Sequence, residues 1–283
     1  MSPDLVRIVF DTVSVAAILV LLVLGMAVIV GMMRIFNLCQ GEFVMLGAVT
    51  AYLGATIAGS TLLGIVLAPL VVGAFGALLE RTIIRRFYAS AAGALLATFA
   101  VGFVVREVVR ALMTQQGAPV PAPIAGSFDL LGASLPVWRL VIVVVTIVVV
   151  VASYLLLGRS ALGLRVRATL DNRELAEATG ISTRRMYAGT YTVGAALAGF
   201  AGAMIVPGRI LYPDIGIDNL IPMFIAVMVG GLGTIEGPLL GALAIGLPTG
   251  LLPAVVNPVF AQVMVIVGAI VFMRLRPAGL VSR

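Results

Sequence analysis

The sequence contains no histidine and no lysine, only one cysteine and one tryptophan, and few charged residues of any kind. Only 11% of the 283 residues are charged, whereas a soluble globular domain carries about 25%. Histidine is the commonest metal ligand and general base near neutral pH, so its absence removes much of the enzyme repertoire. The single Cys39 excludes an intrachain disulfide and argues against a cysteine metal site. We therefore expect no catalytic centre, no cofactor and no metal.

Hydrophobic residues make up 61% of the chain and occur in long runs between short charged clusters. A membrane-spanning helix needs about 20 such residues. The acidic leader with Asp4, Arg7 and Asp11 does not resemble a cleaved signal peptide, so we expect the first run to be retained. We predict an all-α membrane protein, a polytopic bundle of about nine (8–10) transmembrane helices in a single domain over 1–283. Single spans are expected within 12–33, 87–105 (with an extension past Arg106), 140–157 and 186–208. The run 43–79 is long enough for two spans, divided at 59–61. The run 220–273 is expected to hold three, broken at 230–234 and near 253–258.

The arginines predict the orientation of the bundle, because cytoplasmic segments of membrane proteins are enriched in basic residues. With nine spans and a cytoplasmic C-terminus, the N-terminus lies outside. Thirteen of the 18 basic residues then lie inside: Arg34, Arg81, Arg85, Arg86, Arg159, Arg165, Arg167, Arg173, Arg184, Arg185, Arg274, Arg276 and Arg283.

Polar residues at 37–42 separate the first two expected spans. At helical spacing Asn37 and Gln40 share a face, and Glu42 points elsewhere. A carboxylate here is costly unless it is hydrogen-bonded or lines a wet cavity. One alternative is a kinked helix start beside a translocation path; the other is a helix capped by Asn37 with Glu42 favouring its dipole. Apart from Glu42 and Glu107, the expected spans contain no acidic residue; the cluster of Arg106, Glu107 and Arg110 predicts an ion-paired helix end.

Glycine-rich stretches mark two further features. Gly47 and Gly54 belong to a stripe of small residues that allows close helix packing. Gly230, Gly231 and Gly233 precede Pro238, which suits the first turn of a new helix. This second stretch predicts either a broken helix that exposes backbone to a substrate or a simple cytoplasmic turn.

The longest polar connector covers 158–185. Asp171 can cap a short helix, with Glu174 completing a variant capping box and Gly180 as the C-cap. The connector predicts either a docking element for a cytoplasmic partner or an interfacial helix on the membrane. Its mixed charges favour docking.

Three sets of residues resemble a known family. Asn37-Leu-Cys-Gln-Gly-Glu42, followed by Phe-Val-Met-Leu-Gly47-Ala, resembles the asparagine-leucine-alanine-histidine-glycine-glutamate signature of branched-chain amino acid ABC transporter permeases. The connector, from Gly163-Leu-Arg-Val-Arg-Ala to Glu177-Ala-Thr-Gly180-Ile, resembles their ATPase-coupling loop. The segments 230–238 and 276–280 resemble their tail. These landmarks occur in order over essentially the whole chain.

The resemblance implies a bacterial inner-membrane importer of the ABC permease type. Its partners would be a second permease subunit or a second copy, two cytoplasmic ABC ATPases and a periplasmic binding protein, with no nucleic acid. The coupling residues would be Asp171, Glu174, Glu177, Ala178 and Gly180. The translocation path would include Asn37, Gln40, Gly41, Glu42, Gly230, Gly231 and Gly233.

Two observations bear on substrate and mechanism. Gln40 stands where the family usually has histidine, and glutamine cannot be protonated near neutral pH. The family serves leucine-type amino acids, urea, short amides and some organic acids, so any of these could be the substrate. The chain has no phosphate loop of the GxxxxGK[ST] type, so we expect no ATP binding. The alternative function is a single-component secondary transporter or channel.

Overall fold

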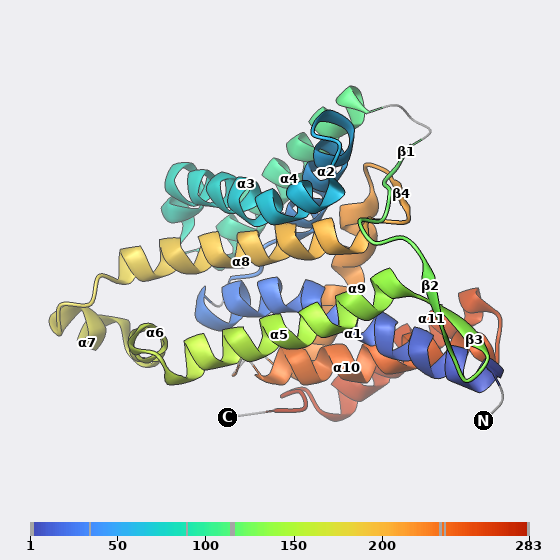
Figure 1. Ribbon diagram of the computed structural model, residues 1–283. Helices are drawn as coiled ribbons and strands as arrows, with labels where there is room; N and C mark the ends of the chain where they lie inside the picture. Colours follow the sequence, from blue (N-terminus) through green and yellow to red (C-terminus); the bar gives the residue numbers. More distant parts are fainter. Residues whose placement is uncertain are drawn as a thin grey trace.

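The computed structural model describes residues 3–33, 35–88, 90–113, 117–231, 234 and 236–281. Helices dominate this part of the chain, with short strands only in the connections (Figure 1). The α-helices are α1 Pro3–Met33, α2 Gln40–Ile57, α3 Thr61–Thr82, α4 Ala91–Leu112, α5 Val137–Arg159, α6 Ala161–Asp171, α7 Arg173–Ala178, α8 Thr183–Ile205, α9 Ile215–Gly230, α10 Glu236–Leu251 and α11 Pro258–Leu275. The strands are β1 Ala118–Pro119, β2 Ser127–Leu130, β3 Ala133–Pro136 and β4 Ile210–Leu211, and two 3-10 helices are η1 Ile84–Phe87 and η2 Leu252–Ala254.

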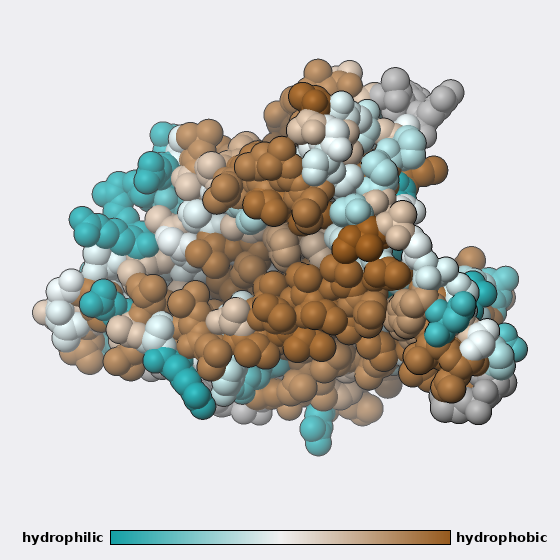
Figure 2. All heavy atoms as spheres, viewed as in Figure 1, coloured by the Kyte–Doolittle hydropathy of each residue, from teal (hydrophilic) through white to brown (hydrophobic). Residues whose placement is uncertain are grey.

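The prediction of a polytopic helical bundle is confirmed. Within the described residues, seven helices are long and apolar enough to cross a membrane, and α9 is a shorter apolar helix. With α2, this makes nine helices of 16 residues or more in the described part. Helix α4 continues past Arg106 to Leu112, as expected. Figure 2 shows the face over α5 as mostly hydrophobic, with hydrophilic residues gathered toward the ends of the bundle.

Helix α1 forms the centre of the bundle. It packs against α8 and α10 over much of its length and also contacts α5 and α9. Its most apolar 18-residue window is 83% buried, whereas the corresponding value for α5 is 11%. The hydroxyls of Thr12 and Ser14 donate to carbonyls one turn earlier, Ile8 and Phe10, at 2.7 Å, so these polar side chains cost little inside α1.

Glycines allow α2, α3 and α8 to approach closely. A Cβ on Gly47 would lie 1.8 Å from the carbonyl oxygen of Gly199, and one on Gly202 would lie 1.8 Å from that of Val44. Val72 of α3 packs on the same part of α8, beside Gly199. Backbone contact of this kind requires small residues, and it fixes the crossing of α2 over α8.

The two ends of the bundle differ in their connections (Figure 1). At one end, β2 and β3 form an antiparallel hairpin whose turn contains Leu131 and Gly132, both with positive φ. Leu-Gly is not a typical pair for a hairpin turn, so the sequence gives little local indication of this hairpin. At the other end, α6 and α7 project between α5 and α8. Near the hairpin, β1 pairs with β4 and joins the segment after α4 to the end of α8.

Candidate functional site

A short non-helical segment, 35–39, carries the chain from α1 into α2 inside the bundle. Helix α2 begins at Gln40, and Cys39 occupies its N-cap position without a side-chain cap hydrogen bond. Asn37 therefore does not cap the helix, contrary to one of the two alternatives; its Oδ1 accepts a hydrogen bond from the backbone N–H of Cys39 at 3.0 Å. The backbone N–H of Leu38 donates to the hydroxyl of Thr98 on α4 at 3.1 Å. Helix α4 thus provides a hydrogen-bond acceptor for a backbone N–H group that has no helical partner at the break between α1 and α2.

The segment brings three polar side chains into the core, which we call the central polar cluster: Asn37, Gln40 and Glu42. All three are at most 1% exposed. The Nδ2 of Asn37 donates to Oε1 of Gln40 at 3.3 Å, so the two side chains lie together, although Asn37 precedes α2 and does not share a helix face with Gln40. Gly41 packs directly on the backbone of Gly216 at the start of α9.

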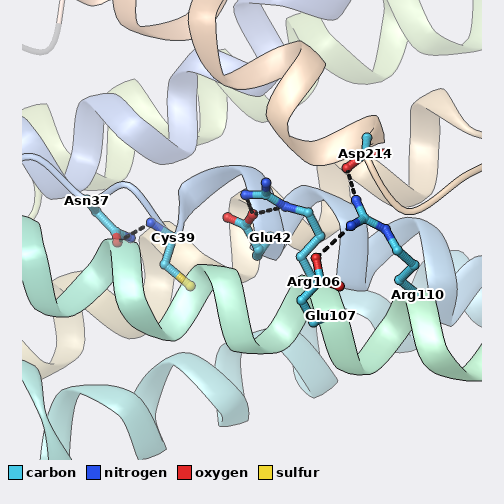
Figure 3. A network of polar contacts seen from close by, with 7 residues as sticks. All are labelled: Asn37, Cys39, Glu42, Arg106, Glu107, Arg110 and Asp214. Atoms are coloured by element: carbon cyan, nitrogen blue, oxygen red, sulfur yellow. Dashed lines mark hydrogen bonds and ion pairs between the residues drawn. The ribbon is translucent and has the colours of Figure 1, made fainter.

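Glu42 forms an ion pair with Arg106 of α4 (Figure 3). Both the Nε and an Nη of Arg106 donate to Oε1 of Glu42, the Nε at 3.0 Å. The carboxylate side chain is 1% exposed and the arginine 14% exposed. Gly102 allows this approach, because a Cβ there would lie 3.0 Å from Oε2 of Glu42. A charge-assisted pair at this depth offsets the desolvation of both groups.

Three buried side-chain atoms have no hydrogen-bond partner among the described residues: Nε2 of Gln40, Oε2 of Glu42 and the hydroxyl of Tyr191 on α8. Tyr191 is 1% exposed and packs edge-on against Phe43, the residue after Glu42. Buried polar groups are normally hydrogen-bonded. A donor and an acceptor left open in the centre of an apolar bundle can engage a small polar molecule.

Helix α4 carries a second charge cluster one turn beyond Arg106. Arg110 donates to Glu107 and to Asp214, both at 2.6 Å, and so connects α4 to the residue before α9 (Figure 3). Ion pairing by Arg106, Glu107 and Arg110 was expected. The sequence pattern did not link Arg106 to Glu42 or Arg110 to Asp214. The four-residue spacing of the two arginines places them on one face of α4, but it does not identify their partners.

The second group of predicted path residues lies elsewhere. Gly230 is the last residue of α9, and Gly231 has a φ of 98° and follows it. Gly216 and Gly230 are separated by about 21 Å along the helix axis. Gly230 packs on Gly237, and Gly231 packs on the C-terminal segment near Gly279, where Leu280 donates to Val229 at 2.9 Å. The structure therefore does not bring Gly230 and Gly231 to the central polar cluster, and Gly233 lies outside the described residues.

The connector 158–185 contains two helices rather than the one expected. Asp171 is the last residue of α6, and Asn172, not Asp171, is the N-cap of α7. Asn172 holds this position because its side chain accepts from the backbone N–H of Leu175 at 3.0 Å. Glu174 and Glu177 lie in α7, and the hydroxyl of Thr183 at the start of α8 donates to Glu177.

Helix α7 ends as predicted. Ala178 is its last residue, and Gly180 has a φ of 83°. The backbone N–H of Ile181 donates to Ala176, and that of Gly180 to Glu177, both at 3.0 Å. This pair of hydrogen bonds defines a Schellman motif, which needs glycine or a residue tolerant of positive φ. Glu174, Leu175, Glu177 and Ala178 are all exposed, so α7 presents a well-defined surface.

Replacement of Asn172 by alanine is expected to loosen α7 without affecting the bundle. Loss of an N-cap costs about 1 kcal/mol, and a helix of six residues has little other support. Amide hydrogen exchange over 173–178 should accelerate about five-fold, the factor for about 1 kcal/mol. Asn172→Asp, which retains the cap, is the control. Unchanged exchange in Asn172→Ala would show that the cap contributes nothing.

Comparison with known proteins identifies the family. The family model for the permease component of branched-chain amino acid transport systems matches residues 8–274. The chain is 25% identical to the high-affinity branched-chain amino acid transport system permease protein LivH of Salmonella typhimurium, over 97% of this chain and 94% of LivH. It is 25% identical to the corresponding protein BraD of Pseudomonas aeruginosa, over 95% and 93% of the two chains.

A probable LivH of Methanocaldococcus jannaschii is 27% identical over 90% of this chain and 83% of its own length. No solved structure matches the chain. The family model spans nearly all of the helices described above, from α1 to α11. The chain therefore belongs to the family of permease components of branched-chain amino acid transport systems.

Proposed function

We propose that this chain is the transmembrane permease subunit of a binding-protein-dependent ABC importer for branched-chain amino acids or related small polar solutes. Its partners are a second permease subunit or copy, two cytoplasmic ATPases and a periplasmic binding protein. The subunit itself is non-catalytic and lies in the inner membrane of a bacterium. The observation that carries the proposal is the connector α6–α7, a capped and exposed element projecting from one end of an otherwise apolar bundle.

The proposed orientation places α6 and α7 in the cytoplasm. Arg165, Arg184 and Arg185 lie in or beside this segment, in agreement with the enrichment of basic residues on the cytoplasmic side. The start of α1 and the segment after α11 lie toward opposite ends of the bundle (Figure 1). This arrangement supports an odd number of crossings, with the N-terminus outside and the C-terminus inside.

The proposed translocation path passes the central polar cluster: Asn37, Gln40, Gly41 and Glu42. The open donor of Gln40 and the open acceptor of Glu42 support a route for a small polar solute at this point. Gly230 and Gly231 belong to the same proposal at the cytoplasmic end of α9, where they would border the exit. Gly233 was predicted with them but lies outside the described residues.

A single-component secondary transporter or channel is the alternative function. A coupled carrier needs ion ligands within its spans. Besides Glu42, the described spans contain one more buried carboxylate, that of Glu80. Glu80 was expected just outside a span that ends at residue 79, but it lies in the last turn of α3. Glu80 accepts hydrogen bonds from Arg85 and Tyr88, and Glu42 accepts them from Arg106. Since both buried carboxylates already have charged partners, the alternative is less well supported.

Docking of the ATPase on α7 is tested with a bulky side chain at the Schellman turn. Gly180→Trp and Glu177→Arg are expected to reduce co-purification of the ATPases and binding-protein-dependent uptake in proteoliposomes by about ten-fold or more, which is about 1.4 kcal/mol of binding. The two substitutions change the proposed ATPase-docking surface at Glu177, Ala178 and Gly180. Asp171 and Glu174 belong to the same proposed surface.

Gly59→Trp is the matched control. Gly59 also has a positive φ, 66°, and, like Gly180, has no atom within 4 Å of a Cβ built on it, but it lies between α2 and α3. Normal ATPase binding by Gly180→Trp would contradict the coupling role. Uptake by the purified chain without ATPases would support the alternative, and the ligand of the binding protein would identify the solute.

A further inference from the structure

A hollow of about 260 Å³ lies between α5 and α8 at the hairpin end of the bundle, away from the proposed path and from α6–α7. Its floor is apolar, with Ile18 of α1, Ile142 of α5 and Ile205 of α8. Trp138 borders it, and the indole N–H donates to the carbonyl of Met204 at 3.2 Å. Helix α5 packs on α1 and makes little other contact with α8, which leaves this space between them.

Two guanidinium groups, those of Arg139 and Arg209, border the same hollow. Arg139 is paired with Asp11 of α1, which also lies 3.9 Å from Arg7. Arg209 has no hydrogen-bond or ion-pair partner for its side chain among the described residues. The pKa of Arg209 is lowered, mainly by partial desolvation of its guanidinium group and to a smaller extent by the nearby positive charge of Arg139. Arg7 and Arg139 thus share the carboxylate of Asp11, and Arg209 has no carboxylate partner among the described residues. The edge of the apolar hollow therefore carries uncompensated positive charge.

We propose that this hollow binds an anionic phospholipid, with the phosphate at Arg139 and Arg209 and the first acyl-chain carbons over the apolar floor. Arginine matches the geometry of phosphate oxygens. Tryptophan is enriched at the depth of lipid headgroups. The outer face of α5 carries exposed Val144, Ile147 and Val148, so lipid can reach the hollow from the side. A soluble anion or a carboxylate of a docking protein would use the arginines but would leave the isoleucine floor unused.

The single tryptophan makes the proposal directly measurable. Trp138 is the only tryptophan in the chain, so its fluorescence reports on this hollow alone. The full chain is placed in bilayers of phosphatidylcholine mixed with phosphatidylglycerol, and one lipid at a time carries brominated acyl chains that quench tryptophan. The wild type is expected to prefer phosphatidylglycerol about five-fold, since one basic residue near a membrane surface contributes about that factor.

Arg209→Gln is expected to abolish this preference, giving a ratio of about 1 between the two lipids. Arg209→Glu is expected to make phosphatidylcholine the preferred lipid. Arg209 is exposed and its side chain has no partner in the described chain, so neither change should disturb folding. Arg7→Gln, at an exposed arginine of the same end that does not line the hollow, is the control and should keep the preference.

Two results would overturn the proposal. Equal quenching by the two brominated lipids in the wild type would exclude an anionic lipid and would leave the arginines to a carboxylate of a partner protein. Loss of the preference on addition of inorganic phosphate, but not of chloride at equal ionic strength, would identify a free anion as the ligand.

Discussion

Replacement of Arg106 by methionine is expected to destabilise the protein more than any other single charge removal in the bundle. The substitution retains much of the side-chain volume but leaves the carboxylate of Glu42 in the core with no counter-charge. Glu42 is 1% exposed, so its carboxylate would stay largely desolvated without the arginine. Removing one partner of a buried ion pair costs about 3–5 kcal/mol. We expect a large fall in the thermal unfolding midpoint in detergent and loss of uptake.

The double variant Arg106→Met with Glu42→Gln distinguishes charge from packing. It removes both charges, so most of the stability should return, while uptake stays low if the pair belongs to the translocation path. Arg110→Met, one turn further along α4, is the matched control. Its pairs with Glu107 and Asp214 are about 40–50% exposed, and such pairs contribute up to about 1 kcal/mol. Equal losses in Arg106→Met and Arg110→Met would refute the special role of the buried pair.

Replacement of Gly47 by alanine is expected to have the second large effect. The added methyl group would lie 1.8 Å from the backbone oxygen of Gly199, and backbone cannot move aside as a flexible side chain can. Helices α2 and α8 would have to separate. Overpacking typically lowers the free energy of unfolding by about 1–3 kcal/mol and occasionally by more. We expect a value at the upper end of this range, because the methyl group would overlap with backbone atoms. The monodisperse yield and the unfolding midpoint should both fall sharply.

Gly268→Ala in α11 is the control for this prediction. Nothing lies within 4 Å of a Cβ built at Gly268, and the residue is helical. The change should be neutral or stabilising by about 0.5–1 kcal/mol, because alanine loses less backbone freedom than glycine in a helix. A Gly47→Ala variant as stable as Gly268→Ala would mean that α2 and α8 are less closely packed than the structure shows.

The helical bundle could be predicted because its cause is local. A run of about 20 apolar residues has few alternatives to a membrane helix. The Schellman end at Gly180 is equally local, and it was predicted. The cap at Asn172 was assigned one residue too early, because Asp171 and Asn172 are both good capping residues and only the end of α6 decides between them.

The pairing of Glu42 with Arg106 could not be predicted, because it joins residues 64 positions apart on helices whose rotation no single-sequence pattern fixes. The same limit explains Glu80. Its position after an apolar run indicated a span boundary, yet Arg85 and Tyr88 in the following turn allow the carboxylate to stay buried in α3. Gly47 was assigned to close packing, but its partner Gly199 required the three-dimensional fold.

The burial of α1 has a consequence for how the protein is made. Helix α1 is synthesised well before its two main neighbours, α8 and α10. Its small and polar contact points, Gly25 against Gly194 and Thr12 against Gly250, therefore face lipid or the insertion machinery until α8 and α10, respectively, have been synthesised. The bundle consequently closes around a helix that is made before its neighbours, and a chain that stops before α10 lacks one of the two helices on which α1 mainly packs.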